Sequence, residues 1–487
     1  MERAKSFESI LLSQGYSIYS NSINTIMGKT VLMAFDDRKD IIISEEKFGF
    51  IGEKTLAGEK TFYKNELNHE NANTLRKVFP FTAPITVLQN SSTMGVGDRL
   101  GIATMGHIQA FNKYINVFPV FAQQSMRELD LTGRSYLDVL DNVSFAVFKN
   151  GYKRGFGADG DHLKTAVEIE SALSIGFSMI TLDCSKYIQT NIDRMSDDEV
   201  NSVYISNPQI EAIYLDSSFD IGQDTFLSFE EMEFKRTVLI FNDAIDFIDS
   251  IYSKFFRKGK YKAELEISID ETEMPTSPIQ HFFVANELHR RGIEFSSLAP
   301  HFCGEFEKGI DYIGNLDQFE REFKFHALIA NHFNYKISIH SGSDKFSVYP
   351  IISRLTNGKL HIKTSGTSWL EAMRIVATVN PMLYRSIHRY ALSVFEDARK
   401  NYRVSTNLEN IPDIDSLSDV SLNNLFSNKD ARQLIHITYG YILNAKDSFG
   451  VYQFKEKLFK IWKENESLYA DQLEEHICRH MNQLWRG

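Results

Sequence analysis

The sequence predicts an α/β protein: a TIM-like (β/α)8 barrel, with a small β-containing subdomain before it and a helical extension after it. Two observations support this fold. Through the middle of the chain an apolar strand, a polar or glycine-bearing loop and a segment of helical periodicity recur, which is the order that parallel strands joined by helices require. Ionisable residues also follow several of these strands, and β/α barrels place their active sites at the carboxyl ends of their strands.

The chain divides into three predicted regions. Residues 1–80 form the N-terminal subdomain, because short β-rich runs at 30–35, 40–44 and 48–51 alternate there with charged or glycine-containing turns. Residues 81–380 form the barrel. Residues 381–487 read as mostly helical and aromatic and are expected to pack on the barrel.

The barrel strands are predicted from short apolar runs followed by polar loops. They are residues 84–88, 143–148, 177–182, 263–269, 295–299, 336–339 and 360–363. The eighth strand needed for closure is assigned to residues 434–438 or to a helical substitute. A strong helix is expected before residue 263, since apolar residues recur there at three- and four-residue steps. These residues include Phe241, Ile245, Ile248 and Tyr252.

Composition limits the class of protein. The net charge of −11 disfavours partners such as nucleic acid or an anionic membrane. The three cysteines are too few and too scattered for a disulfide framework. Neither a signal-peptide pattern nor an apolar run of membrane-spanning length is present in the sequence. We therefore expect a cytoplasmic protein, and a homo-oligomer is compatible with the sequence.

Residues 155–165 crowd glycines with Asp161, His162 and Lys164 between a predicted strand and a predicted helix. Glycines let a backbone turn tightly and pass close to a ligand. Asp161 and His162 are therefore expected to point into one pocket at the rim of the barrel. Asp159, in the same stretch, is expected to cap the loop.

His162, His301 and His340 each follow a different predicted strand. An isolated histidine more often packs or caps locally than binds a metal. Three at the same end of one barrel instead favour a site with three nitrogen ligands and open coordination positions. The sequence therefore predicts one divalent metal cation, for which zinc, nickel, manganese, cobalt and iron are all candidates.

Two carboxylates, Asp161 and Glu266, are expected at the same end of the barrel and could flank a substrate as an acid/base pair. Glu264, Glu266, Ser268 and Asp270 alternate with apolar residues and so share one face of their strand. If that face points into the barrel, it lines a polar pocket. The alternatives are a loop cap for Asp161 and a structural ion pair for Glu266.

Four basic residues, Arg99, Lys149, Lys164 and Lys363, are expected near the same rim. An arginine fork or a lysine point charge there could hold a substrate carboxylate. For any one of them alone, a solvated surface role is the alternative.

Other motifs carry no predicted chemistry. The glycines of residues 95–101 lack the spacing of a dinucleotide-binding fingerprint. His476 and His480 are expected at the surface, since Ile477 stands where the H-E-x-x-H zinc motif has its glutamate. Cys303, close to His301, is expected to be a small packing residue.

The sequence resembles the tagaturonate epimerase family, metal-dependent enzymes that interconvert D-tagaturonate and D-fructuronate by inversion at C4. The matching runs are residues 97–101, 155–165, 266–272, 298–304, 339–345 and 360–369. The resemblance implies a sugar-acid substrate from hexuronate (galacturonate) catabolism. It also implies that Asp161 is the proton acceptor and Glu266 the proton donor, while His162, His301 and His340 hold the metal.

The implied reaction fits retro-aldol cleavage, because the C4 hydrogen is β to the ketone and a carbanion there would be poorly stabilised. Alternatives from the same residues are a related metal-dependent sugar aldolase or aldose-ketose isomerase, and a catalytically silent protein that binds sugar acids. A glycosidase could use Asp161 and Glu266 as its carboxylate pair, but it would leave the three histidines unexplained.

Overall fold

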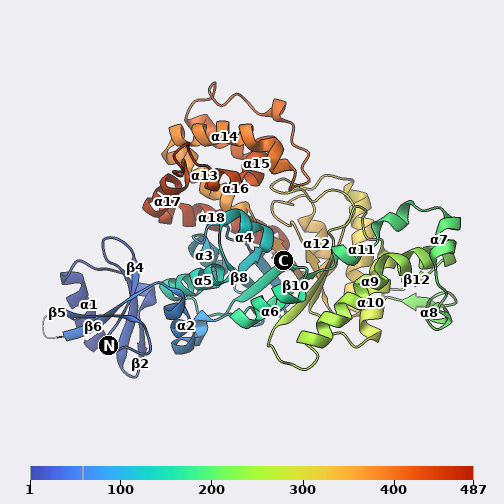
Figure 1. Ribbon diagram of the computed structural model, residues 1–487, viewed down its shortest axis with the longest axis horizontal. Helices are drawn as coiled ribbons and strands as arrows, with labels where there is room; N and C mark the ends of the chain where they lie inside the picture. The colour runs from blue at the N-terminus through green and yellow to red at the C-terminus, as the bar shows by residue number, and fades with distance from the viewer. Residues whose placement is uncertain (1, 58–59, 486–487) are drawn as a thin grey trace.

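The computed structural model describes residues 2–57 and 60–485. Eight parallel strands close into a central barrel flanked by helices, the N-terminal sheet lies to one side of it, and the C-terminal helices gather at another (Figure 1). The predicted α/β barrel, with its β-containing N-terminal region and helical C-terminal extension, is therefore confirmed. The division of the chain at residues 80 and 380 stays a prediction.

The barrel strands follow one another around the wall in chain order, and β16 closes the barrel by pairing with β7. They are β7 (Ser92–Val96), β8 (Val117–Ser125), β9 (Gly157–Leu163), β10 (Met179–Asp183), β13 (Glu264–Ile269), β14 (Ser297–Pro300), β15 (Lys336–Ile339) and β16 (Leu360–Thr364). All neighbouring pairs are parallel. Their carboxyl ends therefore meet at one mouth, where a site can collect side chains from several strands.

Five predicted strands coincide with β10, β13, β14, β15 and β16. The strand predicted at residues 84–88 is wrong, and β7 begins only at Ser92. The backbone N–H groups of Val87 and Leu88 instead donate to the buried carboxylate of Glu264, the first residue of β13. This apolar run therefore plugs the amino end of the barrel rather than joining its wall.

The strand predicted at residues 143–148 is also wrong, because these residues lie in helix α5 (Tyr136–Asn150). An apolar run of this length suits either element, but Ser135 forms a capping box at the start of α5 and Gly151 takes a left-handed conformation at its end. The chain therefore reaches the barrel wall only afterwards. Residues 157–163, expected to lie in a loop, form strand β9 itself.

The eighth strand is β8, and the prediction at residues 434–438 is wrong because helix α15 (Lys429–Ile437) covers most of them. Pro119 lies inside β8 and hides the strand in the sequence, since proline lacks the N–H that a central strand uses.

The N-terminal sheet is antiparallel, with the order β1-β3-β4-β6-β5 and with β2 beside β3. Its strands are β1 (Ser17–Ile18), β2 (Asn24–Ile26), β3 (Lys29–Phe35), β4 (Asp40–Ser44), β5 (Gly52–Ala57) and β6 (Lys60–Glu66). The predicted runs 30–35 and 40–44 match β3 and β4, whereas residues 48–51 form a turn before β5. Helix α1 (Glu2–Ser13) covers one face of the sheet, and α2 (His69–Val78) and α5 cover the other.

The helices that follow barrel strands are α3 (Thr104–Lys113), α4 (Met126–Thr132), α5, α6 (Ala166–Ile175), α9 (Glu231–Phe255), α10 (Pro278–Arg290), α11 (Leu316–His332), α12 (Tyr349–Thr356) and α13 (Thr367–Val379). Helix α9 is the strong helix expected before residue 263. An insertion after β10 contains α7 (Asp197–Val203), α8 (Pro208–Tyr214) and the hairpin of β11 (Ser218–Asp220) and β12 (Phe226–Ser228). Short 3-10 helices are η1 (Ser20–Ser22), η2 (Pro80–Thr82), η3 (Ser185–Tyr187), η4 (Thr190–Arg194), η5 (Leu408–Asn410) and η6 (Val420–Phe426).

The C-terminal extension consists of α14 (Pro381–Arg399), α15, α16 (Tyr439–Asn444), α17 (Lys455–Glu464) and α18 (Glu466–Trp485). Helix α18 runs back along the barrel and packs on α3, α12 and α13. Within residues 2–57 and 60–485, no helix combines the length and apolar character needed to cross a membrane.

Candidate active site

Two cavities open at the carboxyl ends of the barrel strands, with volumes of about 510 Å³ and 230 Å³. The wall of the larger cavity includes Asp270 and His301, and that of the smaller includes Asp161 and His162. The wall common to both is formed by Arg127, Glu271, Lys308, His340 and Ser341. The predicted polar pocket at the mouth of the barrel is therefore one continuous site with two lobes.

Lys363 of β16 stands at the centre of a buried cluster of charges. Its Nζ lies 2.7 Å from Asp159 Oδ2, 2.8 Å from Asp161 Oδ1 and 2.8 Å from Glu266 Oε1. Thr181 on β10 donates its hydroxyl to Asp159 at 3.0 Å. All of these side chains are almost wholly buried inside the barrel, as their alternation along β9, β13 and β16 requires.

Charge pairing keeps most of this cluster ionised. Burial alone would lower the pKa of Lys363, but Asp159, Asp161 and Glu266 raise it well above its usual value. Burial would raise the pKa of Asp161 and of Glu266, but Lys363 and His340 among their neighbours hold both well below the usual range. Burial prevails only at Asp159, whose pKa rises to about 6 despite Lys363. Asp159 is thus a buried partner of Lys363, not the loop cap that the sequence predicts.

Glu266 lies one layer below the cavities. It lines neither of them, and it accepts hydrogen bonds from Ser297 and from His340 Nε2, the latter at 2.8 Å. Asp161 and Lys363, by contrast, both line the smaller cavity. Lys363 and His340, each 2.8 Å from Glu266, therefore stand between its carboxylate and the cavities that they line.

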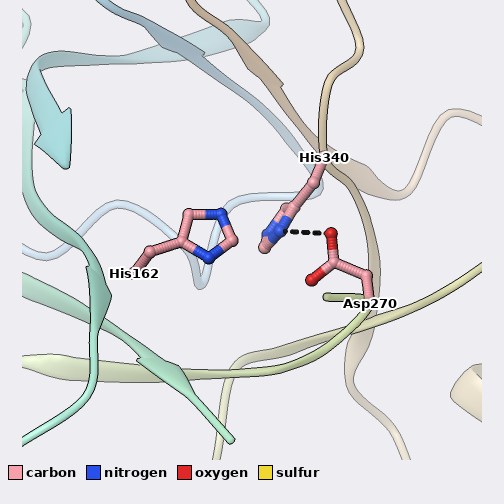
Figure 2. Close-up of side chains that lie close together, drawn as sticks. All are labelled: His162, Asp270 and His340. Atoms are coloured by element: carbon pink, nitrogen blue, oxygen red, sulfur yellow. Dashed lines mark hydrogen bonds and ion pairs between the residues drawn. The ribbon is translucent and has the colours of Figure 1, made fainter. Parts of the chain in front are cut away.

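His162, Asp270 and His340 converge from three different strand ends (Figure 2). One ligand atom from each lies within 4.8 Å of the others. His340 Nδ1 is 3.1 Å from Asp270 Oδ2, and His162 Nδ1 is 3.3 Å from Asp183 Oδ2. His162 has a φ of +55°, a strained conformation for a residue other than glycine that recurs at functional sites.

The chemistry of this group fits a divalent metal. Two imidazoles and one carboxylate are ligands that zinc and other transition metals accept, and carboxylates beside ligating histidines orient the rings. Burial would lower the pKa of His340, but Asp270 and the bonded Glu266 raise it to about 10. The surrounding carboxylates therefore favour positive charge at this point, which either an imidazolium or a metal cation supplies.

His301 follows β14 and lines the larger cavity beside this group. Its Nδ1 lies 3.2 Å from Thr272 Oγ1, and among the described residues the compact group contains Asp270 in its place. The role of His301 as a metal ligand stays a prediction. Asp270 is a candidate that the sequence signalled through its alternation with Glu266, although we assigned it no role.

Two of the four predicted substrate-binding cations, Lys149 and Arg99, lie outside both cavities. Lys149 lies in the last turn of α5, 3.1 Å from Asp40 and 2.8 Å from Glu466, and is remote from the mouth of the barrel because residues 143–148 are helical. Arg99 is buried, with Nε 2.8 Å from Glu128 and its guanidinium over the ring of Tyr439. Both residues hold parts of the fold together instead of lining either cavity.

The two other predicted cations do line the smaller cavity. Lys363 is engaged by its three carboxylates, and Lys164 Nζ lies 3.2 Å from Asp183 Oδ2. Sequence reasoning missed Arg127 and Lys308, which lie on the wall common to both cavities. Arg127 is the second residue of α4, which begins directly after β8, so the undetected strand concealed its position.

His476 and His480 are buried, contrary to the predicted surface location. His476 Nε2 lies 2.9 Å from Asp344 Oδ1, and His480 Nε2 accepts the backbone N–H of Asp344 at 3.0 Å. Arg432 also contacts Asp344, at 2.8 Å. The pair therefore fastens α18 to the loop that follows His340.

Comparison with known proteins agrees with this architecture. A family model described as tagaturonate epimerase matches residues 19–484. The tagaturonate/fructuronate epimerase of Thermotoga maritima is 41% identical over 480 residues, which are 97% of either chain. Crystal structures of fructuronate-tagaturonate epimerase from Cohnella laeviribosi, native and with one glycerol, are 43% identical over 99% of both chains, with a TM-score of 0.94. This chain belongs to the tagaturonate epimerase family and is an enzyme of the isomerase class.

Proposed function

We propose that this enzyme interconverts D-tagaturonate and D-fructuronate by inversion at C4, in hexuronate catabolism, and that it depends on a divalent metal. One observation carries the proposal: Lys363 joins Asp161 and Glu266 directly beside the group of His162, Asp270 and His340. Membership of the family supplies the substrate pair. The cavities, at about 510 Å³ and 230 Å³, have room for a six-carbon acid.

The position of C4 favours a retro-aldol route. When a base removes the C4 hydroxyl proton, the C3–C4 bond breaks, its electrons reduce the C2 carbonyl to an enediolate, and C4 becomes an aldehyde. The aldehyde then turns its other face to C3, the bond forms again, and the new C4 alkoxide takes up a proton. The reaction requires no external oxidant or reductant.

Asp161 and Glu266 suit the two proton transfers. Asp161 is ionised and lines the smaller cavity, so it can accept the hydroxyl proton. The Nζ of Lys363 lies 2.8 Å from both carboxylates, so a proton can pass between them through this amine. Glu266 thereby returns its proton to the product through Lys363, which lines the smaller cavity.

The metal would be held by His162, Asp270 and His340, with His301 on the adjoining wall as a further predicted ligand. When bound, a divalent cation supplies the Lewis acidity that stabilises negative charge on the C2 and C3 oxygens. The native ion is one of zinc, nickel, manganese, cobalt or iron.

Incubation of the purified enzyme with D-tagaturonate tests the proposal. We expect D-fructuronate to form, the activity to disappear with a chelator, and added metal to restore it. The retro-aldol route predicts that a three-carbon aldehyde acid or dihydroxyacetone can be trapped and that no solvent deuterium enters C4. Failure to form fructuronate in the presence of each candidate metal would refute the function, and deuterium at C4 would refute the route.

A further inference from the structure

The wall common to the larger and smaller cavities carries two cations, Arg127 and Lys308, that the proposed proton transfers do not use. The lysines and arginines that line one or both cavities are Arg127, Lys164, Lys308, Lys363 and Arg403. Three of these are neutralised by protein carboxylates: Lys164 by Asp183, Lys363 by its buried cluster, and Arg403 by Glu305 at 2.8 Å. These three cations therefore have little remaining attraction for an anionic ligand.

Arg127 and Lys308 differ from the other three. Within the described part of the chain, neither has a carboxylate oxygen within 4.0 Å. Arg127 contacts the ring of Tyr402 at 4.6 Å and donates to the carbonyl oxygen of Asn401 at 3.3 Å. Lys308 donates to Ser341 Oγ at 2.8 Å. A lysine ammonium has three donors and an arginine has five, so both side chains keep donors for a ligand.

The backbone around Lys308 is fixed in advance. The buried Lys345 donates to the carbonyl oxygens of Glu307 and Ile310, at 2.8 Å and 2.6 Å. The Glu307 carboxylate in turn accepts the backbone N–H of Ser405 at 2.9 Å and the side-chain amide of Gln433 at 2.8 Å. The C-terminal extension thus holds the loop that presents Lys308. Such preorganisation lowers the entropy cost of binding.

Lys308 and Arg127 also lie close to His340 of the candidate metal-binding group. Ser341, the acceptor of Lys308, is the residue after His340, and all four side chains lie on the wall common to both cavities. Burial and the Arg127 guanidinium lower the pKa of Lys308, which an incoming anion would counteract. Glu271 lines the same wall but is exposed and stays outside ion-pair distance of both cations.

We propose that Lys308 and Arg127 form the clamp for the substrate carboxylate, the C6 group at the far end of the molecule from the C2 and C3 oxygens. This inference rests on the proposed function. Arginine offers a planar fork and lysine a point charge, a combination suited to one carboxylate. In a retro-aldol reaction C6 belongs to the fragment that turns, so the clamp retains this fragment while its aldehyde rotates.

The test compares an acid with a neutral sugar. Lys308→Met and Arg127→Met are assayed for KM with D-tagaturonate and for binding by calorimetry. The binding probes are D-tagaturonate and the ketohexose in which CH2OH replaces the carboxylate. We expect each substitution to weaken tagaturonate binding about 10- to 100-fold, the range for one charge-assisted hydrogen bond, and to leave the affinity for the neutral sugar unchanged.

Lys308→Gln retains a donor for Ser341 without the charge and serves as a second variant if methionine disturbs the loop. Arg403→Met is the matched control, because it removes a cation from the same cavity whose charge Glu305 already neutralises. Unchanged binding of tagaturonate, or equal loss for acid and neutral sugar, would overturn the clamp. Calorimetry needs no turnover, so a wild-type enzyme that binds the acid but forms no fructuronate would refute the proposed function and still decide the clamp.

Discussion

Replacing Lys363 by methionine removes the ammonium that three buried carboxylates share. Its Nζ lies 2.7 Å from Asp159 and 2.8 Å from both Asp161 and Glu266. Removing one partner of a buried ion pair destabilises a protein by about 3–5 kcal/mol, because an uncompensated charge stays buried. We expect Lys363→Met to lower the free energy of unfolding at neutral pH by about this amount and to abolish activity.

The loss should depend on pH. In the wild type, Asp161 and Glu266 have pKa values below those of the unfolded chain. Their ionisation therefore stabilises the fold above about pH 4, and this contribution is lost as the pH falls through the depressed values. Without Lys363, burial raises the pKa of the same carboxyls above the unfolded values, so the variant loses stability as the pH rises from about 4. The gap between the two proteins should widen towards neutral pH.

Denaturant unfolding, followed by tryptophan fluorescence at several pH values between 4.5 and 7.5, measures this gap. Lys359→Met is the matched control, since this lysine precedes the same strand and its side-chain ammonium donates to Asn334 at 3.1 Å on the surface. A gap of less than about 1 kcal/mol at pH 7.5, the value of a surface pair, would refute the reasoning. So would a gap that is the same at all pH values.

Three further predictions concern other contacts. His340→Ala should reduce both bound metal, measured by plasma emission spectrometry, and turnover; full activity with unchanged metal would contradict the proposed site. Asp344→Asn should lower the free energy of unfolding by about 3–5 kcal/mol, because Arg432 loses its buried partner. This loss of stability should be present above about pH 4 and disappear as the pH falls below it, since the pKa of Asp344 is depressed in the folded protein. Denaturation midpoints measured for both proteins over a pH series test this. Lys149→Met should lower the melting temperature while leaving KM unchanged, and a raised KM in steady-state kinetics would restore its predicted binding role.

Strands were predictable where a run of apolar, strand-forming residues ends in a polar loop. They were not predictable where the strand itself consists of residues that rarely form strands. β9 reads Gly-Ala-Asp-Gly-Asp-His-Leu, a composition typical of a loop. It is extended because β8 and β10 pair with it on both sides, a tertiary effect that local patterns do not contain. The apolar run at residues 143–148 shows the converse, since the helix caps around it decide its structure.

The candidate site could be located from the sequence but not resolved. Alternation along β13 grouped Glu264, Glu266, Ser268 and Asp270 on one face but left open whether that face points into the barrel; the closed barrel shows that Glu266 and Lys363 are buried inside it. The sequence could not decide whether His301 or Asp270 joins His162 and His340 in the compact group. Ile269 pairs with Pro300, so the two residues that follow stand at the same height on neighbouring strands, and only the direction of each side chain separates them.

The sequence also could not show which cations at the mouth of the barrel are free to bind an anion. Chain position near a predicted strand end selected Lys164 and Lys363 but missed Arg127, which follows the undetected strand β8, and Lys308, which lies in the long loop after β14, although all four line the site. Whether a cation can bind an anionic substrate depends on whether a protein carboxylate already neutralises it, and that pairing is set by residues distant in the sequence. Asp183 neutralises Lys164 from the next strand, whereas the ammonium of Lys308 donates to the hydroxyl of Ser341 and has no carboxylate at ion-pair distance among the described residues. Among the described residues neither Lys308 nor Arg127 has an ion-paired carboxylate, a property that only the three-dimensional structure reveals, and this is why we propose both for the carboxylate of the substrate.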